Sequence, residues 1–347
     1  PLGIPTVLDR VIQQAIAQVL SPLFDTDFSD SSYGFRYGRR AHAAIERISE
    51  ASQEGYKWGV DCDLKGYFDT VNHDLLIHRV SQKVKEKAVL RLIGKYLRAG
   101  VRLIDGTTEK TLKGVPQGGP LSPLLANIML DPLDKMIEAM GHPFARYADD
   151  FLIVTRTKAE ALEVMATVGE YVESRLKLLV NQEKSKVAPL SECAFLGFNI
   201  RGKQIRRTDK AAKRFKNRIQ EITSRSRGIS MKQRLLELNR YSVGWFHYFK
   251  YGLPFKEARD LDQWIRRRIR LCYWKDWKLP RKRRRMLIKL GVSADEVKKA
   301  SRSRKGYWRM SSNSLVQFAL NNAYLAKQGV PSLQDLWVSF KYGDKPK

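Results

Sequence analysis

The sequence predicts an α+β fold, a split βαβ antiparallel sheet with helices on one face, followed by a domain that is helical throughout. Strand patterns alternate with helical patterns up to about residue 200, and only helical patterns follow. The charge changes at the same place, because residues 1–200 hold 25 basic and 25 acidic side chains and residues 201–347 hold 39 and 11. We therefore expect a domain boundary near residues 201–207.

The composition limits the classes of partner and compartment. The whole net charge of +28 lies in the second half, which also has many interleaved aromatic residues, and this combination indicates a nucleic-acid partner. Any single aromatic residue is better explained as part of a helical core. Cys62, Cys193 and Cys272 are isolated, which argues against disulfides or a zinc site and favours a reducing compartment. No apolar run reaches membrane-spanning length, and the missing initial methionine suggests an absent upstream portion.

Residues 1–57 are predicted to form two helices joined by a basic loop. Paired apolar positions predict a helix from Thr6 that ends before Pro22. The apolar face of that helix consists of Val7, Leu8, Val11, Ile12, Ala15, Ile16, Val19 and Leu20. The glycine-punctuated loop 32–40 runs into a helix at about 41–54. Such a loop can approach a phosphate closely, and a solvated basic loop is the equally supported alternative.

A buried strand at about Trp58–Leu64 is predicted to present carboxylates. Asp61 and Asp63 are two residues apart, so they face the same side of a strand. Carboxylates at the end of a core strand are costly unless they bind something. Asn72 is expected to cap a helix, with a second helix near 88–97 and a hairpin at about 101–111.

The segment Gly114–Pro120 is a glycine and proline turn that opens a long helix with an apolar face. Its backbone can lie flat against a ligand, and a helix N-terminus behind it favours a phosphate or a base edge. A turn that only starts the helix is an alternative of similar weight.

The segment Tyr147-Ala148-Asp149-Asp150 lies between two apolar runs and predicts a hairpin with two carboxylates at its tip. Adjacent anions repel each other, and a divalent metal with oxygen ligands is the usual solution. An isolated Asp-Asp pair is more often a polar turn, but the apolar strands and the upstream pair Asp61 and Asp63 favour a metal site. A helix at about 159–177 and a strand at 194–200 complete the domain.

The basic half is predicted to contain helices at about 210–224, 231–248, 255–274 and 315–327. The run Arg281-Lys282-Arg283-Arg284-Arg285 lies between the last two and is interpreted as a phosphate-tracking loop. A localisation tag and a solvated face are the alternatives.

Five motifs stand in the order of the reverse transcriptase palm motifs. They are Asp63–Phe68, Pro116-Gln117-Gly118, Tyr147–Asp150, Asn181–Lys184 and Phe195–Phe198. The sequence around them, including Gly3-Ile4-Pro5, resembles bacterial group II intron-encoded reverse transcriptases, and the basic helical part resembles their thumb or maturase domain. The resemblance covers essentially the whole chain. It implies partial fingers at 1–57, a right-hand polymerase palm at 58–203, and an all-α thumb/maturase domain at 204–347.

The resemblance implies an RNA-directed DNA polymerase with a two-metal mechanism. Asp63, Asp149 and Asp150, together with Leu64, would bind two Mg²⁺ ions. The residues implied around the nucleotide are Phe68 as the gate against a ribose 2′-hydroxyl, Gln117 and Gly118 in the pocket, Arg36 near the template, and Lys184 as a proton donor to pyrophosphate. A core aromatic and a surface lysine are the alternatives for Phe68 and Lys184. The nucleic-acid-binding residues implied in the thumb are Arg266, Arg267, Arg281, Lys282, Arg283, Arg284, Arg285 and Trp308.

The resemblance also implies partners and a location. The partners are group II intron RNA, an RNA template with a DNA primer, target DNA and dNTPs, in the bacterial cytoplasm and without a membrane. Splicing and retrohoming by target-primed reverse transcription would follow. The alternatives are a related reverse transcriptase of a defence, CRISPR-linked or diversity-generating system, and a non-catalytic RNA-binding splicing factor with a vestigial palm. The family's first fingers strands and its Cys/His-rich endonuclease region are not found in this sequence, so target-strand cleavage is not predicted.

Overall fold

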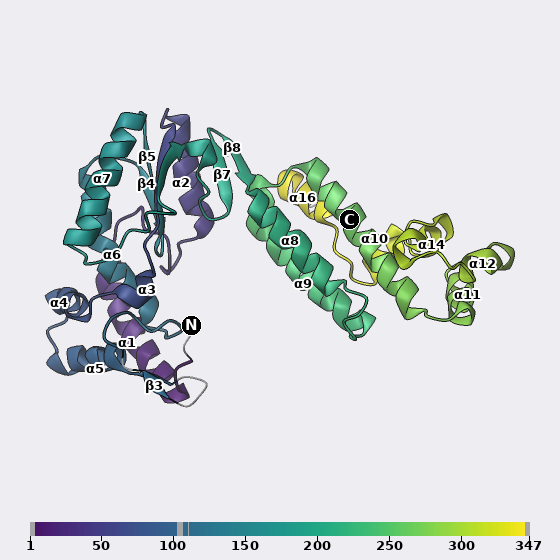
Figure 1. Cartoon of the computed structure of the whole chain (residues 1–347), viewed down its shortest axis with the longest axis horizontal. Coiled ribbons are helices and arrows are strands. Elements are labelled where there is room, and N and C mark those ends of the chain that lie inside the picture. The colour runs from purple at the N-terminus through teal and green to yellow at the C-terminus, as the bar shows by residue number, and fades with distance from the viewer. Residues whose placement is uncertain (1–3, 103–106, 110, 344–347) are drawn as a thin grey trace. The chain divides into compact units, whose positions relative to one another are not determined.

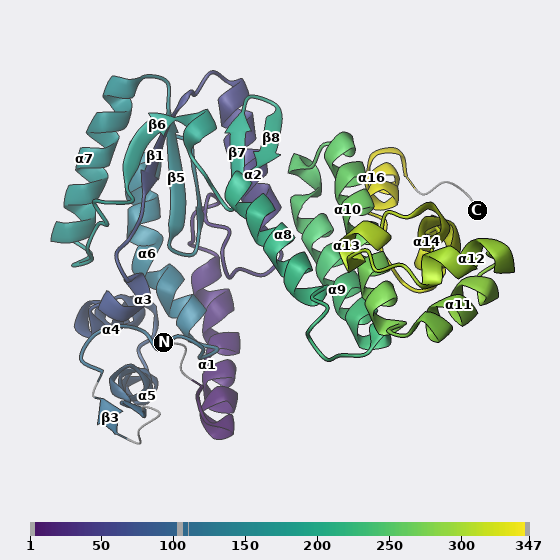
Figure 2. The same cartoon turned by 45° about the vertical axis from the view of Figure 1, so that its right-hand side comes forward.

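The computed structural model describes residues 4–102, 107–109 and 111–343. The chain divides into two compact units, residues 1–205 (unit 1) and 206–347 (unit 2) (Figure 1, Figure 2). Each unit has its own hydrophobic core. In the described part of the chain, no helix is long and apolar enough to cross a membrane.

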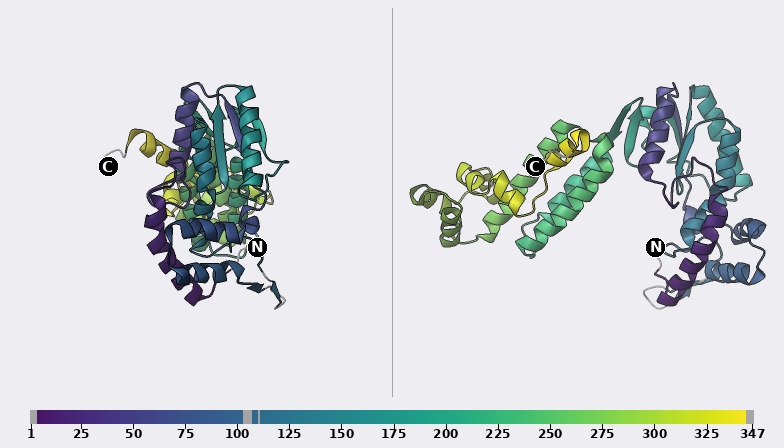
Figure 3. Two further views of the ribbon diagram at one scale, coloured as in Figure 1. Left: turned by 90° about the vertical axis from the view of Figure 1, so that its left-hand side faces the viewer. Right: turned by 180° about the vertical axis from the view of Figure 1, so that it is seen from behind.

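Unit 1 is built on a four-stranded sheet in the order β4-β5-β1-β6. The strands are β1 (Trp58–Cys62), β4 (Phe144–Tyr147), β5 (Asp150–Thr155) and β6 (Lys186–Pro189), and the three pairings within the sheet are antiparallel. Val60, Phe151 and Ile153 are buried in the core that α7 (Lys158–Ser174) covers, and α7 contacts β1, β5 and β6 (Figure 3). The predicted α+β class with an antiparallel sheet is confirmed. Strand β6 was not predicted, because it is short and ends in a proline.

The other elements of unit 1 surround this sheet. They are α1 (Val7–Asp25), α2 (Ala41–Gln53), α3 (Tyr67–Thr70), α4 (His73–Lys83), α5 (Lys87–Arg98), β2 (Val101–Arg102), β3 (Thr108–Glu109), α6 (Ser122–Ala139), η1 (Leu190–Glu192), β7 (Phe198–Arg201) and β8 (Gln204–Arg207). The Asn72 side chain accepts a hydrogen bond from the backbone N–H of Leu75 (2.9 Å), so the predicted cap of α4 is confirmed. The expected hairpin corresponds to β2 and β3, and its residues 103–106 and 110 lie outside the described residues.

Helix α1 differs from its prediction in two ways. It continues past Pro22 to Asp25, because a proline near the end of a helix removes a single backbone donor while the flanking turns still form. Its predicted apolar face is only partly the buried one, since Leu20 is buried and Ile16 packs against the core. The side chains that are buried are Gln13, Ala17, Leu20 and Phe24, whereas Val7, Leu8, Val11 and Val19 are each more than 60% exposed. Periodicity finds apolar positions, but only packing decides which side of the helix meets the protein.

After the end of β8, which crosses the boundary between the units, the described elements of unit 2 are all helices. Its elements are α8 (Asp209–Ile222), α9 (Met231–Phe249), η2 (Lys250–Gly252), α10 (Phe255–Asp276), α11 (Pro280–Lys289), α12 (Ala294–Ser301), α13 (Tyr307–Met310), α14 (Ser314–Ala319), α15 (Asn322–Lys327) and α16 (Leu333–Tyr342). Helices α8, α9 and α10 match their predictions, while the single helix expected at 315–327 is divided into α14 and α15. Aromatic side chains fill the core, for example Trp245 stacked on Phe215 with 4.1 Å between ring centroids.

Candidate active site

The predicted carboxylates lie at the ends of adjacent strands. Strand β1 ends at Cys62, just before Asp63, and β5 begins at Asp150. Cys62 pairs with Phe151, so continuing this register by one residue sets Asp63 opposite Asp150. The turn between β4 and β5 consists of Ala148 and Asp149, and it holds Ala148 in the left-handed region with φ 61°. A non-glycine residue in that region is strained, and such strain is typical of functional sites.

Burial and the neighbouring carboxylates raise the proton affinity of Asp150. The pKa of Asp150 is raised to about 7, first by desolvation and then by the negative charges of Asp61, Asp149 and Asp63. A hydrogen bond to the backbone of Leu196 acts in the opposite direction. Asp150 is exposed as a residue, so water screens part of this repulsion, and the neighbouring carboxylates give the site an excess of negative charge. A site with such an excess favours a cation.

Asp63 is held by the segment that follows α7. Its backbone N–H donates to Ser185 Oγ (3.0 Å), and its Oδ2 accepts a hydrogen bond from Asn181 Nδ2 (2.9 Å). The ammonium of Lys184 lies 3.7 Å from the same oxygen, with 70% of the lysine side chain exposed. The structure therefore brings Lys184 to Asp63, and its role as a proton donor stays a prediction. Leu64 is buried and forms a β-bridge with Val180.

The donor set suits magnesium, although the described residues contain no ready-made cage. Among them, no three His, Cys, Asp or Glu side chains are grouped closely enough to bind a metal ion by themselves. Mg²⁺ usually takes one or two protein carboxylates and completes its shell with water and substrate phosphate oxygens. The oxygen ligands of Asp63, Asp149 and Asp150, with their mutual repulsion, meet that requirement.

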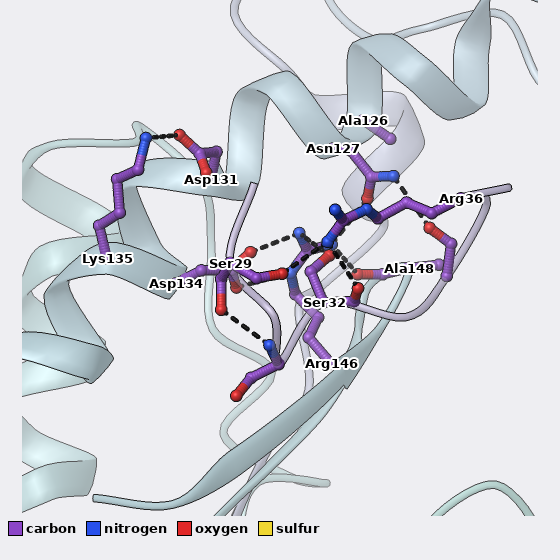
Figure 4. Close-up of polar contacts among 12 residues, drawn as sticks. Ser29, Ser32, Arg36, Ala126, Asn127, Asp131, Asp134, Lys135, Arg146 and Ala148 are labelled. Carbon is purple, nitrogen blue, oxygen red and sulfur yellow. Dashed lines mark hydrogen bonds and ion pairs between the residues drawn. The ribbon is translucent and has the colours of Figure 1, made fainter. Parts of the chain in front are cut away.

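A buried arginine holds the turn that carries these carboxylates (Figure 4). Arg146 is fully buried, and Nε and Nη2 donate to Oδ1 and Oδ2 of the buried Asp134 (2.7 and 2.6 Å). Nη2 also donates to Ser32 Oγ (2.7 Å), and Nη1 donates to Asn127 Oδ1 and the Ala148 carbonyl (both 2.9 Å). All five guanidinium N–H groups are used, and one of them holds the turn through the Ala148 carbonyl.

Sequence reasoning missed this network, although one signal was available. Arg146 interrupts an apolar strand, and Asp134 lies among the apolar residues of α6, so two buried charges of opposite sign required partners. Gly34 adds a second support, because a Cβ atom there would lie 2.2 Å from the backbone nitrogen of Ala148. Asn127 Nδ2 donates to the Gly34 carbonyl (2.9 Å), which ties the loop 32–40 to the same turn.

Arg36 lies in the loop 32–40, and its guanidinium donates hydrogen bonds to other groups of the protein (Figure 4). Its side chain is 4% exposed, and Nε donates to Asp25 Oδ1 (2.6 Å). Nη1 donates to the carbonyls of Ser29 (2.6 Å) and Ser32 (3.0 Å), and Nη2 donates to that of Asp25 (3.0 Å). These bonds shape the loop beside the Arg146 network. A contact of Arg36 with template or nucleotide stays a prediction.

The structure places Phe68 and the glycine-rich turn together. The backbone N–H of Val115 donates to the Phe68 carbonyl (2.6 Å), and a Cβ on Gly114 would lie 2.7 Å from that oxygen. Phe68 is half-buried beside Tyr67, with 5.1 Å between ring centroids, while Gln117 is half-buried and Gly118 is exposed. The three residues predicted to line the nucleotide pocket therefore come from neighbouring backbone segments.

In unit 2, the structure separates the predicted nucleic-acid-binding residues. Arg267 lies over the ring of Trp308 at 3.9 Å, and Trp308 is 40% exposed. Arg266 Nη1 lies 3.8 Å from Asp262 Oδ2, and 16% of the Arg266 side chain is exposed. Exposed platforms of arginine and tryptophan suit stacking on bases.

The prediction of a loop at residues 281–285 is wrong, because the run belongs to helix α11. Pro280 starts this helix, and the buried Leu287 anchors it. Arg281, Arg284 and Arg285 are exposed, whereas Arg283 is buried 4.7 Å from the ring of Trp274. Lys282 pairs with Asp276 at 3.1 Å. A helix sorts consecutive basic residues onto different faces, so the five side chains do not form one surface.

An antiparallel sheet with carboxylates at the ends of its two central strands defines a polymerase palm. The reverse transcriptase (RNA-dependent DNA polymerase) family model matches residues 1–200, and the chain belongs to that family. The maturase-specific domain of group II introns matches residues 212–290.

Similar proteins agree with this assignment. Protein YkfC of Escherichia coli is 31% identical over 59% of this chain and 64% of its own length. The group II intron-encoded protein LtrA of Lactococcus lactis is 39% identical over 54% of this chain and 30% of its own length. The chain thus spans less than two thirds of these relatives. A solved structure of apo telomerase from Candida tropicalis aligns with a TM-score of 0.48 at 12% identity, over 96% of this chain and 58% of that one.

Proposed function

We propose that the protein is an RNA-directed DNA polymerase of a group II intron that also binds intron RNA and promotes splicing. The observation that supports this most directly is the set Asp63, Asp149 and Asp150 at the ends of adjacent palm strands in a member of the reverse transcriptase family. We assign residues 1–57 to the fingers, 58–203 to the palm and 204–347 to the thumb and maturase domain. The match of the maturase-specific domain supports the last assignment.

Different residues of the palm have different roles in the proposed nucleotidyl transfer. Two Mg²⁺ ions, when bound, would activate the primer 3′-hydroxyl and neutralise the triphosphate. Asp63, Asp149 and Asp150 would provide their ligands, and Lys184, whose ammonium lies 3.7 Å from Asp63 Oδ2, would give a proton to the departing pyrophosphate. Phe68 and the 114–118 turn confine the sugar and base, and Arg146 keeps the turn of the two aspartates in place.

The proposed substrates and partners follow from the same assignment. They are an RNA template with a DNA primer, dNTPs, target DNA for retrohoming, and group II intron RNA, in the bacterial cytoplasm. The positive charge of unit 2 suits the phosphate backbones of all the nucleic acids among them.

Primer extension on an RNA template with dNTPs and Mg²⁺ tests the enzymatic part. Asp63→Asn should lower DNA synthesis by about 10³-fold or more, because the loss of one ligand charge removes several kcal/mol of transition-state stabilisation. Asp74→Asn is the matched control, since Asp74 is an exposed carboxylate on α4 outside the site. If Asp63→Asn and Asp74→Asn had equal activity, the assignment of Asp63 to the active site would be wrong.

A further inference from the structure

Unit 2 contains a cationic cavity of about 250 Å³ between the α8–α9 connection and the end of α10. Arg225, Arg234, Lys275 and Lys278 contribute to its wall, together with a single acidic residue, Asp276. Asp276 Oδ2 already pairs with Lys282 Nζ at 3.1 Å. The wall therefore has four cations and no carboxylate that is available to neutralise them.

Arg234 is the unusual member of this group, because it is a buried cation. It is 4% exposed, and Nη1 donates to the backbone carbonyls of Ile222 and Ser224. Its Nε is buried and has no hydrogen-bond partner in the described structure. No ion pair between Arg234 and a carboxylate occurs among the described residues. Burial of an unpaired charge is costly, so Arg234 lacks the counter-charge that would offset its burial.

Other buried arginines of unit 2 do not offer the same opportunity. Arg270 donates Nε to the Leu320 carbonyl (2.9 Å), and Arg283 packs against Trp274. Neither lines the cavity. Arg234 thus combines a buried unpaired charge with an opening where three further cations converge.

We propose that this cavity binds a phosphate group, with Arg234 at its base and Arg225, Lys275 and Lys278 around it. The carbonyl end of α10 opposes an anion with about half a unit charge, which four cations outweigh. Cys272, also in the wall, adds no negative charge, because burial raises the pKa of its thiol. Phosphate oxygens accept several charge-assisted hydrogen bonds at once, which suits a converging set of guanidinium and ammonium groups. That the phosphate belongs to a nucleic-acid backbone rests on the proposed function.

The first experiment tests the phosphate site on the full chain. Arginine Nε–H resonances are followed by NMR while inorganic phosphate replaces chloride at constant ionic strength, and Arg234→Lys identifies the resonance of Arg234. A saturable shift of the Arg234 resonance is expected, because Arg234 lines the cavity and its Nε–H has no partner in the described structure. A resonance that does not move, while the protein is folded, overturns the proposal.

The second experiment identifies the source of the phosphate. Lys275→Gln with Lys278→Gln removes two cavity cations, and Lys216→Gln with Lys327→Gln removes two exposed cations of unit 2 that lie outside the cavity. The cavity variant should bind a structured RNA on the order of tenfold more weakly than the control variant. It should also lose about one unit of the salt slope. Thermal melting verifies that both variants fold.

The outcomes separate this inference from the proposed function. If both variants bind RNA equally and the Arg234 resonance still responds to phosphate, the site takes free phosphate and the assignment to nucleic acid is wrong. If the unaltered chain binds no RNA, the proposed function fails, while the response of Arg234 to phosphate still decides the chemistry of the cavity.

Discussion

The two units bury arginine in opposite ways. In unit 1, Arg146 is completely buried and all five N–H groups are satisfied, with the carboxylate of Asp134 as counter-charge. In unit 2, Arg234 is almost as buried, yet its charge is unpaired and its Nε has no partner in the described structure. The hydrogen bonds of Arg146 are complete within the protein and hold the turn at Ala148. The charge of Arg234 is unpaired, and the proposed anion would neutralise it. This contrast supports the proposed division of roles, in which unit 1 uses charge to position a reaction and unit 2 uses charge to bind a polyanion.

The largest expected effect separates these two uses of charge. Asp149→Ala with Asp150→Ala should reduce DNA synthesis by about 10³-fold or more. Binding of intron RNA and promotion of splicing should remain, because removing two anions cannot weaken attraction to a polyanion. Primer extension, RNA binding and splicing of the native intron are measured on one preparation. A folded variant that no longer splices would show that the two functions are not divided between the units.

The second effect compares the two buried arginines directly. Arg146→Gln should lower the free energy of unfolding of unit 1 by about 3–5 kcal/mol, because it leaves the charge of Asp134 buried and unpaired. Arg234→Gln should cost about 1 kcal/mol, since it loses hydrogen bonds to carbonyls without stranding a carboxylate. Urea unfolding measures both. Adding Asp134→Asn to Arg146→Gln should recover part of the loss, and no recovery would contradict the role given to this ion pair.

The third prediction concerns the basic face of α11. Replacing Arg281, Arg284 and Arg285 by glutamine should reduce the salt dependence of RNA binding by up to about three units of slope, one for each phosphate contact removed. Arg283→Gln is the control, because that side chain lies against Trp274 and its loss affects stability instead. Binding is measured between 50 and 200 mM salt, where these contacts matter most. If both variants changed the salt dependence of RNA binding equally, the arginines of α11 would not be divided between an exposed face and a buried one.

A smaller effect is expected at Phe68. Phe68→Ala should increase ribonucleotide incorporation by roughly tenfold, because a smaller side chain leaves room for a 2′-hydroxyl, an interaction worth about 1–3 kcal/mol. Single-nucleotide extension with rNTP and dNTP measures this ratio, and DNA synthesis itself should persist. Unchanged sugar discrimination would show that Phe68 only packs against the core beside Tyr67.

The smallest expected effect is a difference between the two units in the urea concentration at which their buried cysteines become accessible to alkylation. Burial raises the pKa of Cys62 and Cys193 in unit 1 to about 11, and raises that of Cys272 in unit 2. At pH 8, about one in a thousand thiols with a pKa of 11 is ionised, so the native protein should resist alkylation. Mass spectrometry of alkylation against urea should give separate transitions for the two units. Coincident labelling of all three cysteines would mean that the units unfold together.

The sequence alone predicted three of the four strands of the sheet, β1, β4 and β5, and the carboxylates at their ends. Alternating apolar residues on both sides of Asp149 and Asp150, and a buried strand before Asp63, follow from the two-residue period of strands and need no tertiary information. Helices α8, α9 and α10 were predictable for the same reason, since their apolar residues recur at the helical period. The change from no net charge before residue 200 to a strong positive charge after it indicated the boundary between the two units.

Only the tertiary structure decided which partners these residues meet. Residues far apart in sequence, Ser32, Asp134 and Arg146, satisfy one another only after folding, and no local pattern specifies such a pairing. The apolar stripe of α1 was visible, but its direction was set by packing, and α11 turned a presumed loop into a helix with one arginine inside. The cavity around Arg234 likewise depends on two connections meeting in space. Local periodicity gives elements and their apolar positions, whereas burial, register and charge pairing are properties of the assembled fold.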